Sequence, residues 1–363
     1  MKRVIKISVI ILALLITTIM PDYVYADTEN FDHYTIYNEV GEYLFEKTGV
    51  EVGDYYISNK YQKYEVISID DTTGTGVAKF LYTIEKPKVN FNPYANPIST
   101  NTNKVICMYM THNDESYVPT DGTESVYGAG GIHDVAKHFA NALESYGITT
   151  HVNETLHIPH DTSAYSRSSL TAKKLIQDYE PNAIFDIHRD GASRAYYINK
   201  DSNGRENCMV RMVVGKANSS MEINEQFAIY LMAVADEISP GLFKDIYYAK
   251  GHYNQALHPK ALLFEFGSHM VEKSLAMSAS DKLAKVVNTA LFNTTVDNES
   301  GEISINNSPT ESTPTINDAL DTSYDNISKS NANIILRILI LAIGVAITIW
   351  IVSKILKKYN ADE

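Results

Sequence analysis

Hydrophobic residues between positions 104 and 293 follow two alternating patterns. A short continuous apolar run, as in a buried strand covered on both faces, occurs at 105–110, and further strand-like segments occur at 148–152, 183–187, 209–214 and 261–266. Longer stretches with the spacing of a helix that buries one face occur at 132–146, 170–179, 223–238 and 271–291. Strands that alternate with helices predict an α/β domain with a mainly parallel sheet and helices on both faces. In such sheets, binding sites lie at the carboxyl ends of the strands.

The residues before this domain have a different pattern. Positions 27–90 are rich in Tyr, Val, Ile and Thr, and apolar and polar residues alternate in stretches such as 64–69. This alternation is typical of half-buried strands, so we expect a small N-terminal module of β or α+β character. Residues 91–103 contain Pro93 and Pro97 among several Asn residues and predict a linker. The sequence of the module itself indicates no chemistry.

Each end of the chain carries an apolar run. Residues 1–26 combine basic residues, an apolar stretch and a small-residue cleavage site, as in a secretory signal peptide. An uncleaved N-terminal anchor is the alternative interpretation. Residues 334–352 would form roughly 28 Å of apolar helix, close to the thickness of a bilayer core, and predict a transmembrane helix. Several Lys residues follow, so we expect residues 353–363 to form a cytoplasmic tail.

The segment between the α/β domain and this helix is polar. Residues 294–333 consist mainly of Asn, Ser, Thr, Asp, Glu and Pro, and they cannot bury enough apolar surface to offset the entropy of ordering. We therefore expect a disordered stalk. The expected localisation is the cell membrane, with a single span and the α/β domain on the extracytoplasmic side.

Charge and cysteine content change this picture little. The formal net charge of -13 argues against nucleic acid as a partner, because nucleic-acid binding needs a clustered basic face. Cys107 and Cys208 could form a disulfide bond in an exported protein. Both lie in or beside apolar runs, however, where a buried thiol behaves as a small hydrophobic residue, so we favour two free thiols.

Polar side chains follow two of the predicted strands. His112 and Glu115 stand three positions apart directly after the strand at 105–110, and His188 directly follows the strand at 183–187. Two imidazoles and a carboxylate, with one position left for water, form the usual ligand set of a catalytic zinc ion. By itself the His-x-x-Glu spacing is weak evidence, because a turn-forming polar cluster can have the same sequence.

Glu265 is the strongest single signal, because a carboxylate within an apolar strand is costly to bury unless it is paired or functional. Desolvation would raise its pKa, which suits a general base that passes a proton to a leaving amine. The alternative is an acid on a solvated face of the strand. Arg189 could pair with such an acid, or could hold a carboxylate of the substrate.

Five motifs in order resemble the stage II sporulation protein P family over roughly residues 104–292. They are Thr-His-x-x-Glu-Ser, Asp-Ile-His-Arg-Asp, Val-Val-Gly, Tyr-Asn-Gln and Leu-Phe-Glu-Phe-Gly. That family is similar in turn to zinc N-acetylmuramoyl-L-alanine amidases. The resemblance implies a zinc-dependent peptidoglycan hydrolase that cleaves this amide, with peptide cross-links as a second substrate, during forespore engulfment. It also implies stage II sporulation proteins D and M as partners.

The resemblance assigns roles to individual residues. His112, Glu115 and His188 correspond to the zinc ligands, and Glu265 corresponds to the catalytic acid and base. The residues expected to position the glycan or stem peptide are Arg189, Asn254 and Gln255.

Rival residues and functions remain. Glu124 is a rival to Glu115 as a ligand, because amidases of this type often take their Glu ligand from just ahead of the following helix. The rival imidazoles are His133, His252 and His258. An Asn commonly follows the Glu-Phe-Gly motif in the family, whereas this chain has His269 and Met270 there. The alternative functions are a metallocarboxypeptidase-like exopeptidase and a non-catalytic peptidoglycan-binding scaffold.

Overall fold

The computed structural model describes residues 33–89 and 103–293. The predicted signal peptide, stalk, transmembrane helix and tail, and most of the linker, lie outside the described residues. Among the helices of the described ranges, none has the length and apolar character needed to cross a membrane.

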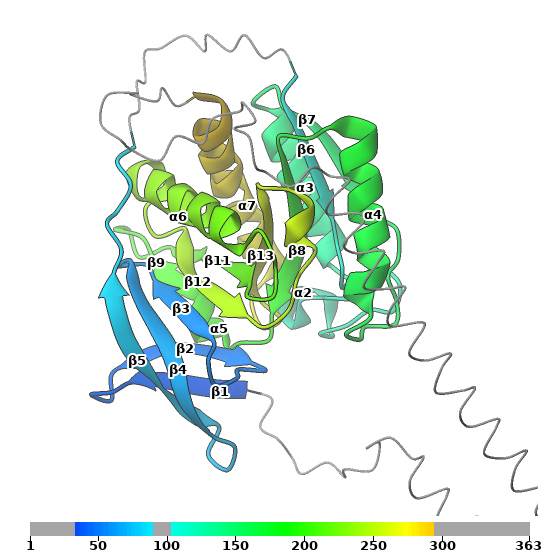
Figure 1. Ribbon diagram of the computed structural model, residues 1–363. Coiled ribbons are helices and arrows are strands. Elements are labelled where there is room, and N and C mark those ends of the chain that lie inside the picture. The colour runs from blue at the N-terminus through cyan, green and yellow to red at the C-terminus, as the bar shows by residue number, and fades with distance from the viewer. Residues whose placement is uncertain (1–32, 90–102, 294–363) are drawn as a thin grey trace, which may run out of the picture.

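A single sheet of eleven strands runs through both parts of the described chain, in the order β2-β1-β5-β4-β3-β12-β11-β13-β8-β6-β7 (Figure 1). The strands of the N-terminal module are β1 (His33–Asn38), β2 (Tyr43–Thr48), β3 (Tyr55–Ser58), β4 (Gln62–Asp70) and β5 (Thr75–Thr83). The strands of the α/β region in this sheet are β6 (Val105–Tyr109), β7 (Thr149–Asn153), β8 (Ala183–Asp190), β11 (Val210–Gly215), β12 (Phe243–Ala249) and β13 (Ala261–Ser268).

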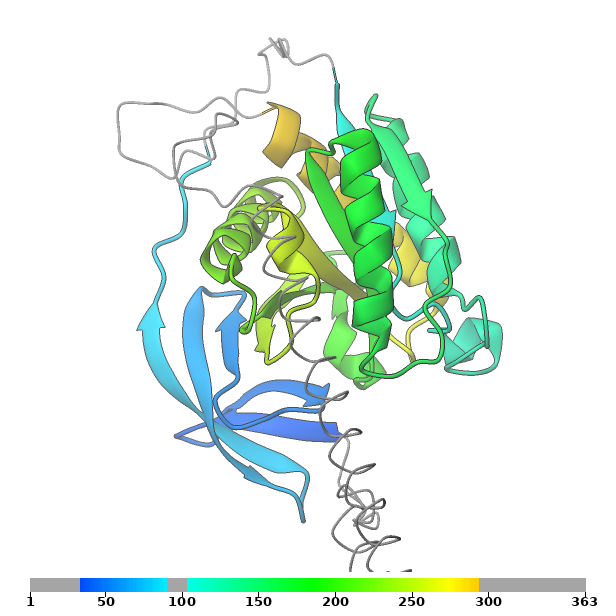
Figure 2. The same ribbon diagram turned by 45° about the vertical axis from the view of Figure 1, so that its right-hand side comes forward.

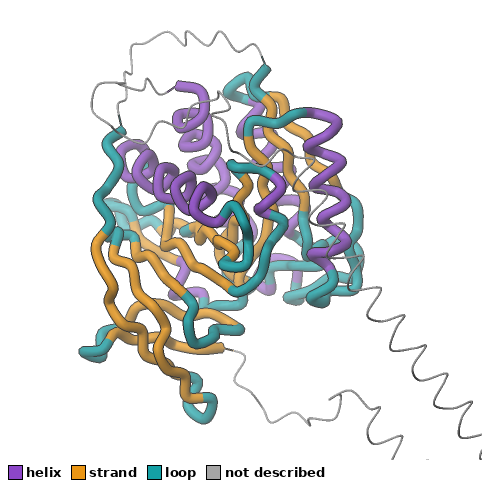
Figure 3. Tube along the Cα trace, in the orientation of Figure 1, coloured by secondary structure: helices purple, strands orange, loops and turns teal. Residues whose placement is uncertain are grey.

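The N-terminal module is continuous with the α/β region through its third strand. β3 pairs antiparallel with β12, from Asp245 opposite Ser58 to Tyr248 opposite Tyr55. The remaining strands of the module curl away from this junction, as Figure 3 shows for the strands at the lower left. The chain division predicted at 91–103 therefore does not interrupt the sheet, whose hydrogen bonds join the two parts.

The sheet is mixed as a whole, but its α/β region is mainly parallel, as predicted: of the five strand pairs there, only β11 with β13 is antiparallel. The parallel pairs include β7 with β6, β6 with β8 and β8 with β13. In contrast, β11 pairs antiparallel with β13. Parallel strands need a long crossover connection. Between β8 and β11 the chain forms only α5 (Arg194–Tyr197) and a hairpin of β9 (Ile198–Lys200) and β10 (Glu206–Cys208), so it re-enters the sheet from the same end.

Helices cover both faces of the α/β part of the sheet, as predicted (Figure 2). The longer helices are α3 (Ile132–Glu144), α4 (Ala164–Tyr179), α6 (Met221–Ile238) and α7 (Lys273–Asn288). Besides α5, the short ones are α2 (Val118–Asp121), the 3-10 helix η1 (Gln255–Leu257) and the π-helical turn η2 (Thr289–Asn293).

The sheet separates two hydrophobic cores. Alternate residues of a strand belong to different cores, because successive side chains point to opposite faces. In β6, Ile106 and Met108 contribute to the larger core with α3, α6 and α7. Cys107 belongs to the smaller core beneath α4. Cys107 and Cys208 are both buried free thiols, as we favoured from the sequence.

Candidate metal centre

His112, Glu115 and His188 meet at one carboxylate oxygen. Oε1 of Glu115 lies 3.2 Å from Nδ1 of His112 and 3.2 Å from Nδ1 of His188. His112 and Glu115 belong to the loop after β6, and His188 lies near the carboxyl end of the neighbouring strand β8. Glu115 and His188 are 3% and 2% exposed, whereas the side chain of His112 is 16% exposed, so solvent reaches the cluster only on the side of His112.

Backbone contacts fix the loop that carries His112 and Glu115. Thr111 donates from its main-chain N–H to Oδ1 of Asp186 at 2.8 Å and from its hydroxyl to Oδ2 at 2.5 Å. The main-chain N–H of Arg189 donates to Oε2 of Glu115 at 2.8 Å, which leaves Oε1 to face the imidazoles. The loop folds back because it is bound to β8 at two points. Thr111 at its start contacts Asp186, and the side chain of Glu115 contacts the main chain of Arg189.

The electrostatic environment keeps Glu115 ionised. Burial alone would raise the pKa of this carboxyl, but His188, His112 and Arg189 together hold it well below its usual range. For His188, burial alone would lower the pKa, and the carboxylates of Asp186 and Glu115 raise it well above the usual value. The carboxylates of Glu115 and Asp186 therefore stabilise a positive charge at His188. Either a proton or a metal cation can provide this charge.

The donor set fits a zinc ion. Two imidazoles and one carboxylate are the protein ligands of many catalytic zinc sites. A ligating histidine usually gives its other ring nitrogen to a carboxylate, and Nε2 of His188 lies 3.0 Å from Oδ1 of Asp186. That contact does not have hydrogen-bond geometry in the described structure, so the ring is placed beside Asp186 without being bonded to it.

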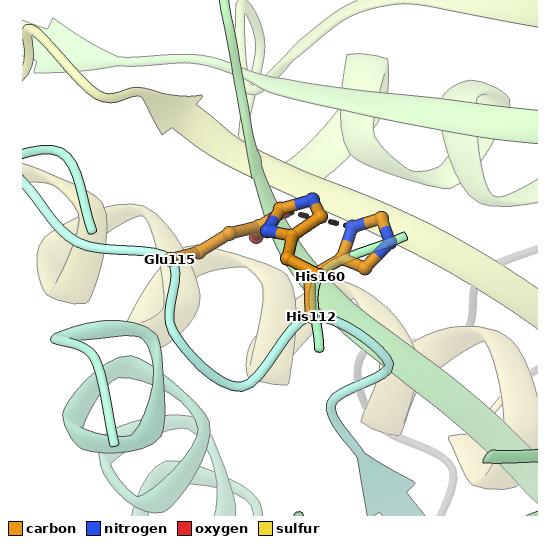
Figure 4. A group of neighbouring side chains, drawn as sticks. All are labelled: His112, Glu115 and His160. Carbon is orange, nitrogen blue, oxygen red and sulfur yellow. Dashed lines mark hydrogen bonds and ion pairs between the residues drawn. The ribbon is translucent and has the colours of Figure 1, made fainter. Parts of the chain in front are cut away.

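His160 is a further imidazole that we did not predict from the sequence (Figure 4). Its ring stacks on that of His112 with centroids 3.8 Å apart, and ligand atoms of His112, Glu115 and His160 all lie within 4.8 Å of one another. Its Nδ1 contacts Oδ1 of Asp114 at 2.8 Å, and its side chain is 40% exposed. The long loop between β7 and α4 carries it, and no spacing in that loop marks it as a ligand.

Glu265 lies beside the cluster on the same face of the sheet. It is opposite His188 in the register of β13 and β8, and it is 7% exposed. Its Oε2 is buried and has no hydrogen-bond partner among the described residues. Burial is the largest of the effects that raise the pKa of Glu265 to about 7. A carboxyl with such a pKa can both accept and return a proton near neutral pH.

Lys47 of the N-terminal module also reaches this face, which the sequence did not indicate. Its Nζ lies 3.0 Å from Oδ1 of Asp190 and 3.7 Å from Oε1 of Glu265. Lys47 and Asp190 are 143 positions apart in the chain. Only the curl of the sheet brings β2 to the end of β8, and the local sequence of β2 contains no signal for it.

The predicted substrate-binding residues make hydrogen bonds to other residues of the protein. The guanidinium of Arg189 donates to the carbonyls of Ser116 and Glu124 at 3.2 and 2.8 Å, so it fastens the loop that carries Glu115. Asn254 donates to the carbonyl of Tyr165 at 3.1 Å. Their predicted contacts with substrate stay predictions.

Gln255 has no free polar group for a ligand. It is 1% exposed, accepts from the N–H of Gly215 at 2.9 Å and donates to the carbonyl of Val213 at 2.7 Å. Its amide therefore joins η1 to the end of β11. A direct contact with substrate would require these bonds to open, so any effect on substrate would act through the loop that holds Asn254.

The rival ligands lie apart from the cluster or are engaged elsewhere. Glu124 is exposed and contributes its carbonyl rather than its carboxylate to the site. His133 contacts Glu154 at 3.2 Å, and Nε2 of His258 lies 3.0 Å from the carbonyl of Pro181. His252 is exposed. The residues whose ligand atoms all lie within 4.8 Å of one another are His112, Glu115 and His160; among the described residues this group includes none of the four rivals, and it does not include His188.

Comparison with known proteins gives matches of two kinds. The family model described as stage II sporulation protein P matches residues 38–288. A relative, stage II sporulation protein P of Bacillus subtilis (strain 168), is 32% identical over 187 residues, which are 47% of this chain and 46% of the relative. The match thus spans about half the length of that relative.

Two solved structures show weak similarity. They are the CwlD amidase from Clostridioides difficile in complex with the GerS lipoprotein and an N-acetylmuramoyl-L-alanine amidase from Clostridium difficile 630. Their identities are 10% and 12% and their TM-scores 0.36 and 0.32. Each similarity covers 52% of this chain and 96% or 94% of the other. At such TM-scores the similarity supports no assignment of function.

The family match is stronger evidence than these structural similarities. It extends over well more than half of the chain, and it includes β2 to β5 of the N-terminal module and every residue of the candidate metal centre. The chain belongs to the stage II sporulation protein P family.

Proposed function

We propose that this protein is a zinc-dependent peptidoglycan hydrolase that acts in sporulation. The bond cleaved would be the amide between N-acetylmuramic acid and L-alanine, with peptide cross-links as a second substrate. The observation that carries the proposal is the meeting of His112, Glu115 and His188 at one buried carboxylate oxygen, with Glu265 beside them. Family membership supports the role in sporulation.

In this proposal His112, Glu115 and His188 would hold the zinc ion, with His160 as a neighbour that packs on His112. Bound there, zinc would supply a Lewis acid for the scissile carbonyl and lower the pKa of a water molecule. Asp186 lies beside the ring of His188, 3.0 Å from its Nε2, and the main-chain N–H of Arg189 donates to the carboxylate of Glu115. The hydrogen bond from Arg189 orients Glu115 before any substrate binds.

Glu265 would move the proton. Its unpartnered Oε2 is the atom free to take a proton from the attacking water and to return it to the leaving amine. Bulk water is largely excluded from this oxygen, since Glu265 is 7% exposed and its Oε2 is buried. Arg189, Asn254 and Gln255 would shape the side of the site where glycan or stem peptide binds.

Location and partners complete the proposal. The site would act on the extracytoplasmic side of the cell membrane, tethered by the apolar run at 334–352. Stage II sporulation proteins D and M would be its partners, as family resemblance implies.

Two nearly isosteric variants test the roles of the two carboxylates. Glu265→Gln should lower turnover by about 10²–10⁴-fold, the usual contribution of a general acid and base, while zinc content and binding to isolated sacculi persist. Glu115→Gln should lose zinc, because a ligand sets metal affinity, and added zinc should restore part of the activity. Zinc content, sacculus binding and release of muropeptides are measured for both.

Each variant is the control for the other, since both remove one carboxylate charge from the same face. If Glu265→Gln lost zinc while Glu115→Gln kept it, the two roles would be exchanged. If neither variant lost activity, the site would not be catalytic.

A further inference from the structure

A buried network of charged residues extends from the N-terminal module to the candidate metal centre. Arg211 of β11 is fully buried, and it contacts Oδ2 of Asp190 at 2.6 Å and Oδ1 of Asp245 at 2.7 Å. Asp190 contacts Nζ of Lys47 through its other oxygen at 3.0 Å. Buried charges are stable only when they are paired in this manner. The network therefore fixes the ammonium group of Lys47 on the face that carries Glu265.

The two oxygens of Glu265 differ in their surroundings. Oε1 lies 3.7 Å from Nζ of Lys47, whereas Oε2 has no hydrogen-bond partner among the described residues. Attraction between Lys47 and Oε1 favours the rotation of the carboxylate that keeps Oε1 beside the ammonium group. Among the described residues, Oε2 is then the oxygen left without a partner.

The hairpin that carries Lys47 is itself fastened to the loop after β8. Nδ1 of His33 lies 3.2 Å from the carbonyl of Gly191, and Ser193 donates its main-chain N–H to Oε1 of Glu46 at 3.1 Å. Glu46 also contacts Nε2 of His33 at 3.1 Å. These contacts hold β1 and β2 against the end of the strand that bears His188. The contacts of the β1–β2 hairpin therefore place Lys47 in the site, and its position does not depend only on the reach of a flexible side chain.

We propose that Lys47 is a positioning residue of the active site, which holds Oε1 of Glu265 and directs Oε2 toward the reacting bond. The N-terminal module is then part of the catalytic centre and not only a neighbouring domain. This inference rests on the proposed function, because it assigns Lys47 a role through the general acid and base.

Three variants of the full-length, zinc-loaded chain test the proposal on a soluble N-acetylmuramoyl-peptide. Lys47→Met removes the charge and keeps most of the length of the side chain, and Lys47→Arg keeps the charge. Lys79→Met makes the same chemical change at an exposed position of β5 in the same module. The measurements are kcat, KM, zinc content and the temperature of unfolding.

Lys47→Met should lower kcat by about 10²-fold, the scale of loss when a catalytic group is misplaced by about 1 Å, while KM and zinc content stay near those of the parent. The unfolding temperature should fall, because Asp190 keeps Arg211 but loses Lys47 as a partner, and it should stay above the temperature of the assay. Lys47→Arg should regain most of this loss, and Lys79→Met should equal the parent. These differences separate a positioning role from a structural one, since unfolding would lower the amount of active enzyme and its zinc together.

Three results would overturn the inference. They are a kcat for Lys47→Met equal to that of Lys79→Met, a loss explained by missing zinc or unfolded protein, and a Lys47→Arg variant as slow as Lys47→Met. A parent chain that cleaves no substrate would instead refute the proposed function, and the inference with it. A parent that cleaves, with an equally active Lys47→Met, would refute the inference alone.

Discussion

His258 shows how a single buried residue can be tested apart from the site. Nε2 of this ring lies 3.0 Å from the carbonyl of Pro181, and its Nδ1 accepts from the main-chain N–H of Lys260 at 3.0 Å. Both bonds require the neutral ring with the proton on Nε2. Burial is the main cause that lowers the pKa of His258 to about 4.

Protonation of His258 should therefore destabilise the fold as the pH falls. An unfolded histidine has a pKa of about 6.5, so between about pH 6.5 and 4 the unfolded chain binds a proton that the folded chain does not. The stability of the parent relative to His258→Gln should thus be greatest above about pH 6.5 and decline toward pH 4. Urea unfolding of both proteins across this range measures it, and a difference that does not change with pH would contradict the account.

At the scale of residues, local sequence predicted those side chains whose type conflicts with their surroundings. Glu265 stands out within an apolar strand, and the structure confirms that it is buried. His112, Glu115 and His188 follow strand signals, and the structure brings them together, while their roles as ligands stay predictions. Lys47 could not be found this way, because an isolated Lys in a half-buried strand is ordinary and its partner lies on a distant strand.

The contact between the β1–β2 hairpin and the loop after β8 can be tested at the scale of elements. A Cβ at Gly191 would lie 2.9 Å from Cγ2 of Thr48 and 3.1 Å from its Oγ1. Gly191 has no positive φ, so Ala is compatible with its backbone and only the neighbour opposes it. Overpacking of this kind typically costs about 1–3 kcal/mol.

We expect Gly191→Ala to lower the free energy of unfolding by about 1–3 kcal/mol in the parent chain. In a Thr48→Ala background both close atoms are gone, and the same substitution should cost at most about 0.5 kcal/mol. Denaturant unfolding of the two single variants and the double variant measures this coupling. Equal costs in the two backgrounds would show that the hairpin does not pack on this loop.

The elements themselves were predicted better than their directions. Largely apolar segments located β6, β8, β11 and β13, because such a segment identifies a buried strand whatever its direction. Direction depends on what connects the strands. The antiparallel pairing of β11 with β13 follows from the short helix and hairpin between β8 and β11, which the hydrophobic pattern did not resolve.

At the scale of the whole molecule, the sequence did not predict that the N-terminal module and the α/β region share one sheet. The sequence predicts an N-terminal module without chemistry, separated by a linker, yet β3 pairs with β12 and Lys47 reaches Glu265. Contacts across such distances in the chain depend on the curl of the complete sheet, which no local pattern encodes. The family match also begins within the module, at residue 38, which agrees with a unit that includes both parts.

The central claim is that this site cleaves peptidoglycan at the amide of N-acetylmuramic acid. Mass spectrometry of sacculi digested with the zinc-loaded, full-length chain tests it most directly, with Glu265→Gln as the matched control. The account predicts glycan fragments that have lost their stem peptides, together with free peptides that begin with L-alanine, and neither product with Glu265→Gln. Shortened stem peptides on intact glycan–peptide bonds would indicate an exopeptidase, and an unchanged sacculus would indicate a scaffold; either result would contradict the claim.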